Sequence, residues 1–165
     1  MSFVIAIYVK EGIVLASDSR TTFSAVERIQ PKKEGESPSV VNHLGVHVSD
    51  TNYKSFVTRN HVGITTCGDA SIKGQPITGY LEAFIREYDT ADVETIANAL
   101  LPYFKKIEPN LKSIFTVAGY KYVKENHINY KDVNCFILNP DSMAVYFSKK
   151  FIAIEYCGNP YKKSI

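Results

Sequence analysis

Apolar residues near the start of the chain fall into two short runs that are separated by a polar turn. Residues 3–9 and 13–17 are rich in β-branched side chains, and the turn between them is residues 10–12. Two such runs joined by a short turn that contains glycine predict a β-hairpin. Folding the second strand back along the first brings Asp18 beside Ser2.

The apolar pattern is interrupted after this hairpin and then resumes. Residues 23–48 hold two prolines, two glycines and a run of charged side chains. We therefore expect a loop insertion over this stretch, with residues 31–38 forming a solvated loop or flap. Beyond it, residues 54–58 and 62–67 predict a second hairpin, with a turn at residues 59–61.

The spacing of apolar residues then lengthens to three or four positions, as is typical of helices. Apolar positions recur at this spacing over residues 77–85 and again over residues 93–104, where Asp92 provides a cap for the second helix. Two helices between sets of antiparallel strands predict an α+β fold with two stacked sheets and helices outside. The remaining strand-like runs are residues 113–122, 133–139, 143–147 and 151–156.

Composition limits the class of protein without naming it. A chain of 165 residues with 45% hydrophobic and 22% charged residues is sufficient for one domain, residues 1–165, with a sizeable core. A net charge of +2 gives no argument for nucleic acid or an anionic membrane, and no apolar run is long enough to span one. Cys67, Cys135 and Cys157 are widely spaced, which favours reduced, buried cysteines in the cytoplasm over a disulfide or a zinc site.

The first hairpin resembles the N-terminus of proteasome β-type subunits and their bacterial relatives, which are N-terminal-nucleophile hydrolases. In that pattern a terminal hydroxyl residue begins a strand, and the next strand ends in Ala-x-Asp-Ser-Arg-x-Thr. The second hairpin strengthens the resemblance, because Lys54 opens one strand and Gly68, 14 residues later, closes the next. The residues that match the first pattern are Ser2, Ala16, Asp18, Ser19, Arg20 and Thr22.

The resemblance implies a four-layer sandwich, in which two stacked antiparallel sheets are flanked by helices. It covers nearly all of this chain but only about two-thirds to three-quarters of the family domain, so the C-terminal helical layer is expected to be missing. The segment between Asp18 and Lys54 is longer than the family's by roughly twenty residues, which a surface loop accommodates at little cost. Asn159 stands where the family has a serine.

These residue types suit amide hydrolysis. A serine hydroxyl needs a base to accept its proton, and an N-terminal α-amine with a pKa near ~8 is partly neutral at pH 7. Removal of Met1 would make Ser2 such a residue. Lys54 would lower the pKa of that amine, Asp18 would hold Lys54 in place, and the backbone N–H of Gly68 could donate to a developing oxyanion.

The resemblance also implies how a substrate binds. A peptide would lie as an added strand between the backbone of Thr22 and that of residues 68–70. Arg20 belongs to the same expected substrate-binding set. The first specificity pocket would be bordered by small or polar residues, which are Thr21, Asn52, Thr66 and Ala70.

Two further interpretations remain open. The chain could be a non-catalytic proteasome-like scaffold or assembly subunit, or a hydrolase of small amides. A third possibility is that the site residues have structural roles only. Asp18 would then form an Asx turn, and Lys54 would be a surface lysine of an edge strand. We expect no cofactor and no metal, because His43 and His47 lie in an expected loop with nothing to fix their spacing. The expected partners are a peptide or protein substrate, further copies in a ring or stack, and an ATPase in some relatives.

Overall fold

The computed structural model describes residues 2–29, 39–50, 52–125, 128–141, 145–148 and 152–157. Side-chain surroundings are described for fewer residues, and those of residues 22–49 and 122–131 are not among them. The chain divides into two compact units, each of which is described by itself. The first unit comprises Met1–Asp18 and Tyr53–Ile165, and the second is Ser19–Asn52.

The described elements are two helices and a set of mostly antiparallel strands, which confirms the α+β class. In chain order they are β1 (Ser2–Val9), β2 (Gly12–Ser17), β3 (Thr21–Ile29), β4 (Ser39–Ser49), β5 (Ser55–Val57), β6 (Gly63–Cys67), β7 (Ser71–Ile72), β8 (Gln75–Pro76), α1 (Ile77–Tyr88), α2 (Val93–Ile107), β9 (Ile114–Glu125), β10 (Ile128–Leu138), β11 (Val145–Ser148) and β12 (Ile152–Cys157).

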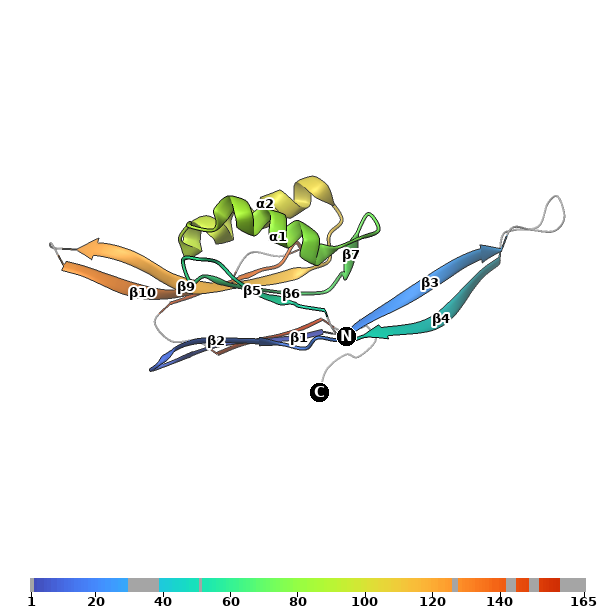
Figure 1. The fold of residues 1–165 in the computed structure, drawn as a ribbon, viewed down its shortest axis with the longest axis horizontal. Coiled ribbons are helices and arrows are strands. Elements are labelled where there is room, and N and C mark those ends of the chain that lie inside the picture. Colours follow the sequence, from blue (N-terminus) through green and yellow to red (C-terminus); the bar gives the residue numbers. More distant parts are fainter. Residues whose placement is uncertain are drawn as a thin grey trace. The chain divides into compact units, whose positions relative to one another are not determined.

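Two sheets make up most of the first unit. The larger one has the strand order β11-β10-β9-β6-β5, and the smaller one has the order β12-β1-β2. The predicted hairpins are present, because β1 pairs with β2 and β5 pairs with β6, both antiparallel. Figure 1 shows α1 and α2 on one side of the larger sheet, with β1 and β2 on its other side.

The larger sheet carries a different core on each side. On the helix side, Phe84 of α1, Phe104 of α2 and Phe115 of β9 are fully buried in one apolar cluster. On the other side, Ala6 of β1 packs in a second cluster with smaller residues of β9 and β10, such as Ala118.

Both helices begin and end close to where the sequence predicts. Asp92 caps α2, since its Oδ1 accepts a hydrogen bond from the backbone N–H of Thr95 at 2.8 Å. The helix α1 begins at Ile77, directly after a small hairpin formed by β7 and β8. The last residue before α1 is Pro76, which offers no side-chain cap.

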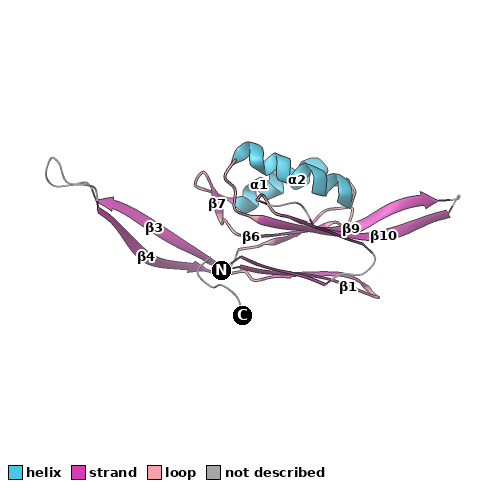
Figure 2. Cartoon of the chain, turned by 180° about the vertical axis from the view of Figure 1, so that it is seen from behind, coloured by secondary structure: helices cyan, strands magenta, loops and turns pink. Residues whose placement is uncertain are grey.

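The second unit is a two-stranded hairpin rather than the expected loop insertion. The strands β3 and β4 pair over most of their length, from Thr21 opposite Ser49 to Ile29 opposite Ser39, with an irregularity between Phe23 and Ala25. The expected flap at residues 31–38 lies outside the described residues. Figure 2 shows β3 and β4 as two strands that run side by side.

Candidate active site

The side chain of Lys54 connects two of the predicted catalytic residues. Its Nζ donates a hydrogen bond to Ser2 Oγ at 3.1 Å and forms an ion pair with Asp18 Oδ2 at 2.7 Å. The Lys54 side chain is 10% exposed and that of Asp18 is 30% exposed, so the pair is largely shielded from water. The contact to Ser2 spans 52 positions of the sequence.

The hairpin of β1 and β2 positions the serine and the carboxylate. Val4 lies opposite Ser17 in the register, so Asp18 follows the last residue of β2 and reaches the beginning of β1. The backbone N–H of Asp18 donates to Phe3 O at 3.1 Å, and Phe3 N donates to Asp18 Oδ1 at 2.7 Å. One carboxylate oxygen therefore holds the strand while the other holds Lys54.

The larger sheet positions the lysine. Lys54 directly precedes β5, and its carbonyl oxygen accepts a hydrogen bond from Thr66 N of β6 at 3.0 Å. This bond continues the pairing of β5 with β6 by one residue, so the backbone of Lys54 is fixed to the sheet. The ammonium group then extends from the end of one sheet to Ser2 and Asp18 on the other.

Gly68 was predicted as the oxyanion donor, and its described surroundings give it a packing role as well. No described hydrogen bond joins it to Ser2; it lies two residues beyond Thr66 in the same segment. Its φ is +119°, and an added Cβ would approach Lys112 O to 2.4 Å and Ser113 Cα to 2.8 Å. Any side chain here would collide with backbone atoms, so glycine is required for the fold itself.

The segment around Gly68 also differs from a simple turn into a helix, because β7 and β8 lie between Gly68 and α1. Asp69 Oδ2 accepts a hydrogen bond from Lys112 N at 2.9 Å, which fixes the segment to the loop before β9. Ala70 is predicted to bind substrate, and its carbonyl oxygen accepts a hydrogen bond from Ile77 N at 3.1 Å. Thr66, predicted to border a specificity pocket, is 3% exposed, and its Oγ1 has no hydrogen-bond partner among the described atoms.

The other predicted substrate-binding residues belong to the second unit. Arg20 is engaged in an ion pair, with its Nε 2.8 Å from Asp50 Oδ1. The hydrogen bond from Arg20 is the main reason that the pKa of Asp50 lies below its usual value. Thr21 is buried, while Thr22 lies in β3 opposite Val48 and its side chain is outside the described set.

The expectation of three reduced cysteines is wrong for Cys67, which is disulfide-bonded. Spacing along a sequence does not reveal which distant strand ends meet, and Cys67 is the buried last residue of β6. Cys135 is a free thiol, and burial raises its pKa to about 12. Unpaired cysteines therefore no longer support a reducing compartment for this chain.

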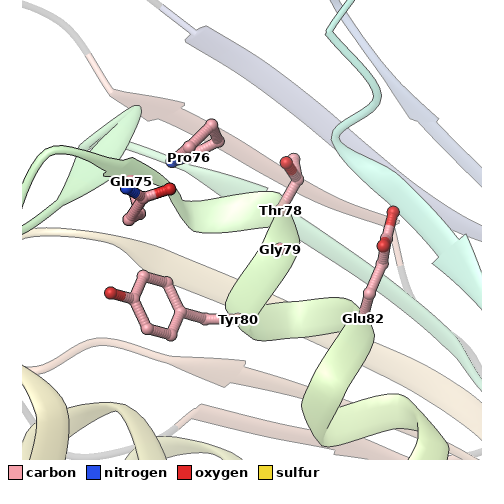
Figure 3. Close-up of a pocket in the computed structure, with 6 residues that line it drawn as sticks. All are labelled: Gln75, Pro76, Thr78, Gly79, Tyr80 and Glu82. Carbon is pink, nitrogen blue, oxygen red and sulfur yellow. The ribbon is translucent and has the colours of Figure 1, made fainter.

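A pocket of about 380 Å³ lies at the beginning of α1, apart from the predicted catalytic residues. Figure 3 shows that its lining comes from β8 and the first turns of α1. Ala70, a predicted site residue, accepts a hydrogen bond from the backbone N–H of Ile77, which lies between two of the lining residues in the sequence. The lining residues are Gln75, Pro76, Thr78, Gly79, Tyr80 and Glu82.

The described part of the chain offers no metal cluster and no helix that spans a membrane. No group of three or more His, Cys, Asp and Glu residues in it is arranged to hold a metal ion. His43 and His47 lie in β4 rather than in the expected loop. Among the described residues, neither helix has the length and apolar character needed to cross a membrane.

Two useful contacts at the site were not predicted. Phe3 contributes its backbone N–H and carbonyl oxygen, which sequence reasoning cannot single out. Ser17 and Ser55 form a side-chain hydrogen bond of 2.7 Å between the same strand ends that carry Asp18 and Lys54. Their signal in the sequence is their position, since each is the direct neighbour of one member of the ion pair.

Comparisons of this chain with protein-family models, with curated proteins and with solved structures found no match. The proteasome-like interpretation therefore depends on the sequence motifs and on the geometry of the site.

Proposed function

We propose that the chain is an N-terminal-nucleophile hydrolase that cleaves amide bonds in peptides, with Ser2 as the nucleophile. The observation that carries this proposal is the hydrogen bond from Lys54 Nζ to Ser2 Oγ at 3.1 Å, in a lysine that is itself held by Asp18. A charged donor directed at a serine oxygen stabilises the negative charge that this oxygen acquires as it loses its proton.

The proposed reaction needs a chain whose first residue is Ser2. The free α-amine of Ser2 accepts the proton from Oγ, and Oγ forms a bond to the carbonyl carbon of the substrate. The C–N bond then breaks, and the leaving amine takes the proton. Water attacks the resulting ester with the α-amine again as base, the acid leaves, and Oγ recovers its proton.

Asp18 has a positioning role in this scheme. Its two oxygens make separate contacts, one to Phe3 N and one to Lys54 Nζ. The carboxylate thus holds the ammonium group at a fixed place relative to the beginning of β1, where Ser2 lies. Gly68 remains the proposed oxyanion donor through its backbone N–H, while its φ of +119° and its packing against Lys112 both require glycine.

The finer assignment of the fold belongs to the same proposal. Three layers of the proposed four-layer sandwich have support: α1 and α2 cover one face of the larger sheet, and Ala6 of β1 packs against residues of β9 and β10 on the other face. A peptide or protein substrate, a cytoplasmic location, assembly into a homo-oligomeric ring or stack, and a possible ATPase partner rest on the resemblance alone.

Turnover of a fluorogenic peptide amide with a small apolar residue before the scissile bond tests the mechanism. We expect Ser2→Ala to abolish turnover, because the nucleophile is lost, and Lys54→Ala to reduce it by at least about 10²–10³-fold, the usual loss when one charge-stabilising donor is removed. Ser2→Thr keeps the hydroxyl and should retain activity. Lys106→Ala, on the exposed side of α2, is the matched lysine control.

Full turnover in Ser2→Ala or Lys54→Ala would end the N-terminal-serine mechanism. An inactive parent chain with Ser2 at its N-terminus would favour the scaffold interpretation, in which Lys54 and Asp18 only join two sheets. Turnover of simple acyl amides but not of peptides would favour the small-amide hydrolase.

A further inference from the structure

The ends of β2 and β5 meet through two contacts that are one residue apart. Lys54 Nζ lies 2.7 Å from Asp18 Oδ2, and Ser55 Oγ lies 2.7 Å from Ser17 Oγ. The strand β2 belongs to the smaller sheet and β5 is the edge of the larger one. Both contacts therefore connect the two sheets beside Ser2.

Each charged residue is already fixed to its own sheet. Asp18 is held to β1 by two hydrogen bonds with the backbone of Phe3, at 3.1 Å and 2.7 Å. Lys54 is held to β6 by the 3.0 Å bond from Thr66 N to its carbonyl oxygen. The distance between the ammonium group and Ser2 consequently depends on how the two sheets are spaced at this corner.

The serine contact restricts that spacing more tightly than the ion pair does. A serine hydroxyl is attached directly to Cβ, so a hydrogen bond between two serines forms only when the two backbones lie at a short, defined separation. The Lys54 ammonium group is carried on a flexible four-carbon chain that can follow a shift of the backbone. The ion pair alone could therefore form at several separations of the β2 and β5 backbones, whereas the hydrogen bond between the serines forms at few of them.

We propose that Ser17 and Ser55 are positioning residues that set the distance from Lys54 Nζ to Ser2 Oγ. The catalytic consequence rests on the proposed function; the structural role does not. Ser55 is exposed and Ser17 is half-buried, so their bond contributes little to stability compared with its effect on geometry. In enzymes a misplacement of about 1 Å can cost up to about 10²-fold in rate.

Two measurements on the folded chain with Ser2 at its N-terminus test this proposal. The first is the rate at which Lys54 is acylated by an amine-reactive ester, followed by peptide mass spectrometry. The second is the acylation of Ser2 by a peptide β-lactone, which gives a maximal rate and a half-saturating concentration. The variants are Ser17→Ala, Ser55→Ala, the double variant, Ser55→Thr as the conservative replacement and Thr90→Ala as a hydroxyl control in the turn between α1 and α2.

We expect each alanine variant to label Lys54 about tenfold faster and to lower the maximal rate of Ser2 acylation about tenfold, with the half-saturating concentration unchanged. The double variant should be no worse than either single one, because both remove the same contact. Ser55→Thr and Thr90→Ala should match the parent chain in both measurements.

The two measurements separate failure of this proposal from failure of the proposed function. Unchanged labelling of Lys54 in both alanine variants overturns the positioning role, whatever happens at Ser2. A multiplicative loss in the double variant overturns it as well, since the serines would then act independently. The expected labelling pattern in a chain whose Ser2 never reacts would uphold the positioning role and reject the hydrolase. A lower unfolding midpoint without faster labelling would contradict positioning.

Discussion

Two ion pairs of nearly equal length lie in different regions of the molecule. Arg20 and Asp50, in the second unit, are 2.8 Å apart, with side chains that are 65% and 57% exposed. Lys54 and Asp18, in the first unit, are 2.7 Å apart, with side chains that are 10% and 30% exposed. Water and salt screen the first pair, while the second lies where charge interactions are strong.

The comparison shows that contact distance does not identify a functional pair. The Lys54 pair differs in its surroundings, because the lysine also contacts a buried serine hydroxyl and the carboxylate also accepts a backbone N–H. The same contrast separates two glycines with positive φ. Gly68, at φ +119°, is enclosed by backbone atoms. Gly74, at φ +78°, has open space where an alanine Cβ would lie.

The largest expected effect concerns these two glycines. Gly68→Ala should lower the free energy of unfolding by about 2–5 kcal/mol, the sum of backbone strain and a collision with Lys112 O. Gly74→Ala should cost only the strain, about 1–2 kcal/mol. Urea unfolding of the two variants measures this difference. Equal losses in the free energy of unfolding would show that the backbone around Gly68 shifts to relieve the collision at little cost.

The next effect compares the lysine with the arginine. Lys54→Ala leaves the partly shielded Asp18 carboxylate without its cation, and we expect a loss of about 1–3 kcal/mol in the free energy of unfolding. Arg20→Ala should leave stability unchanged within error, because both partners are open to water. Thermal and urea unfolding would contradict the comparison if the arginine variant lost as much as the lysine variant.

The smallest effect is a pH dependence in the second unit. The hydrogen bond from Arg20 lowers the pKa of Asp50 below its ordinary value of 3.8. A lowered folded-state pKa gives stability that is present above the unfolded pKa and lost as the pH falls through the folded pKa. The small contribution of Asp50 should therefore disappear below about pH 4.

A titration of the Asp50 carboxyl by NMR tests this directly. The pKa should rise towards its ordinary value in Arg20→Ala, and also in the parent chain at 1 M salt, because screening weakens an exposed pair. If the pKa of Asp50 stays low both in Arg20→Ala and at 1 M salt, an interaction other than the Arg20 pair must lower it.

Local sequence patterns predicted the parts of the site that lie close together in the chain. The turn at residues 10–11 sets the register of β1 with β2, so Asp18 lies at the beginning of β1 as expected, where its Oδ1 accepts the backbone N–H of Phe3. The approach of Lys54 came from the resemblance, because no local pattern shows which strand ends meet across 36 positions.

The failures have the same physical origin. The sequence of residues 23–48 is typical of a loop, because it combines prolines, glycines and charged side chains, and it therefore does not predict the pairing of β3 with β4. The disulfide at Cys67 and the contact between Ser17 and Ser55 depend on tertiary approach, which the spacing of residues along the chain does not encode. Arg20, Thr21 and Thr22 lie in the second unit, so their expected contact with a substrate stays a prediction.

The most direct test of the central claim is the intact mass of the chain with Ser2 as its first residue, before and after treatment with a peptide β-lactone. The lactone ring opens on a competent nucleophile, so we predict a mass increase of one probe, located on Ser2 and absent in Ser2→Ala and Lys54→Ala. A folded chain with a free Ser2 amine that gains no mass, or that gains it equally in Ser2→Ala, would contradict the account.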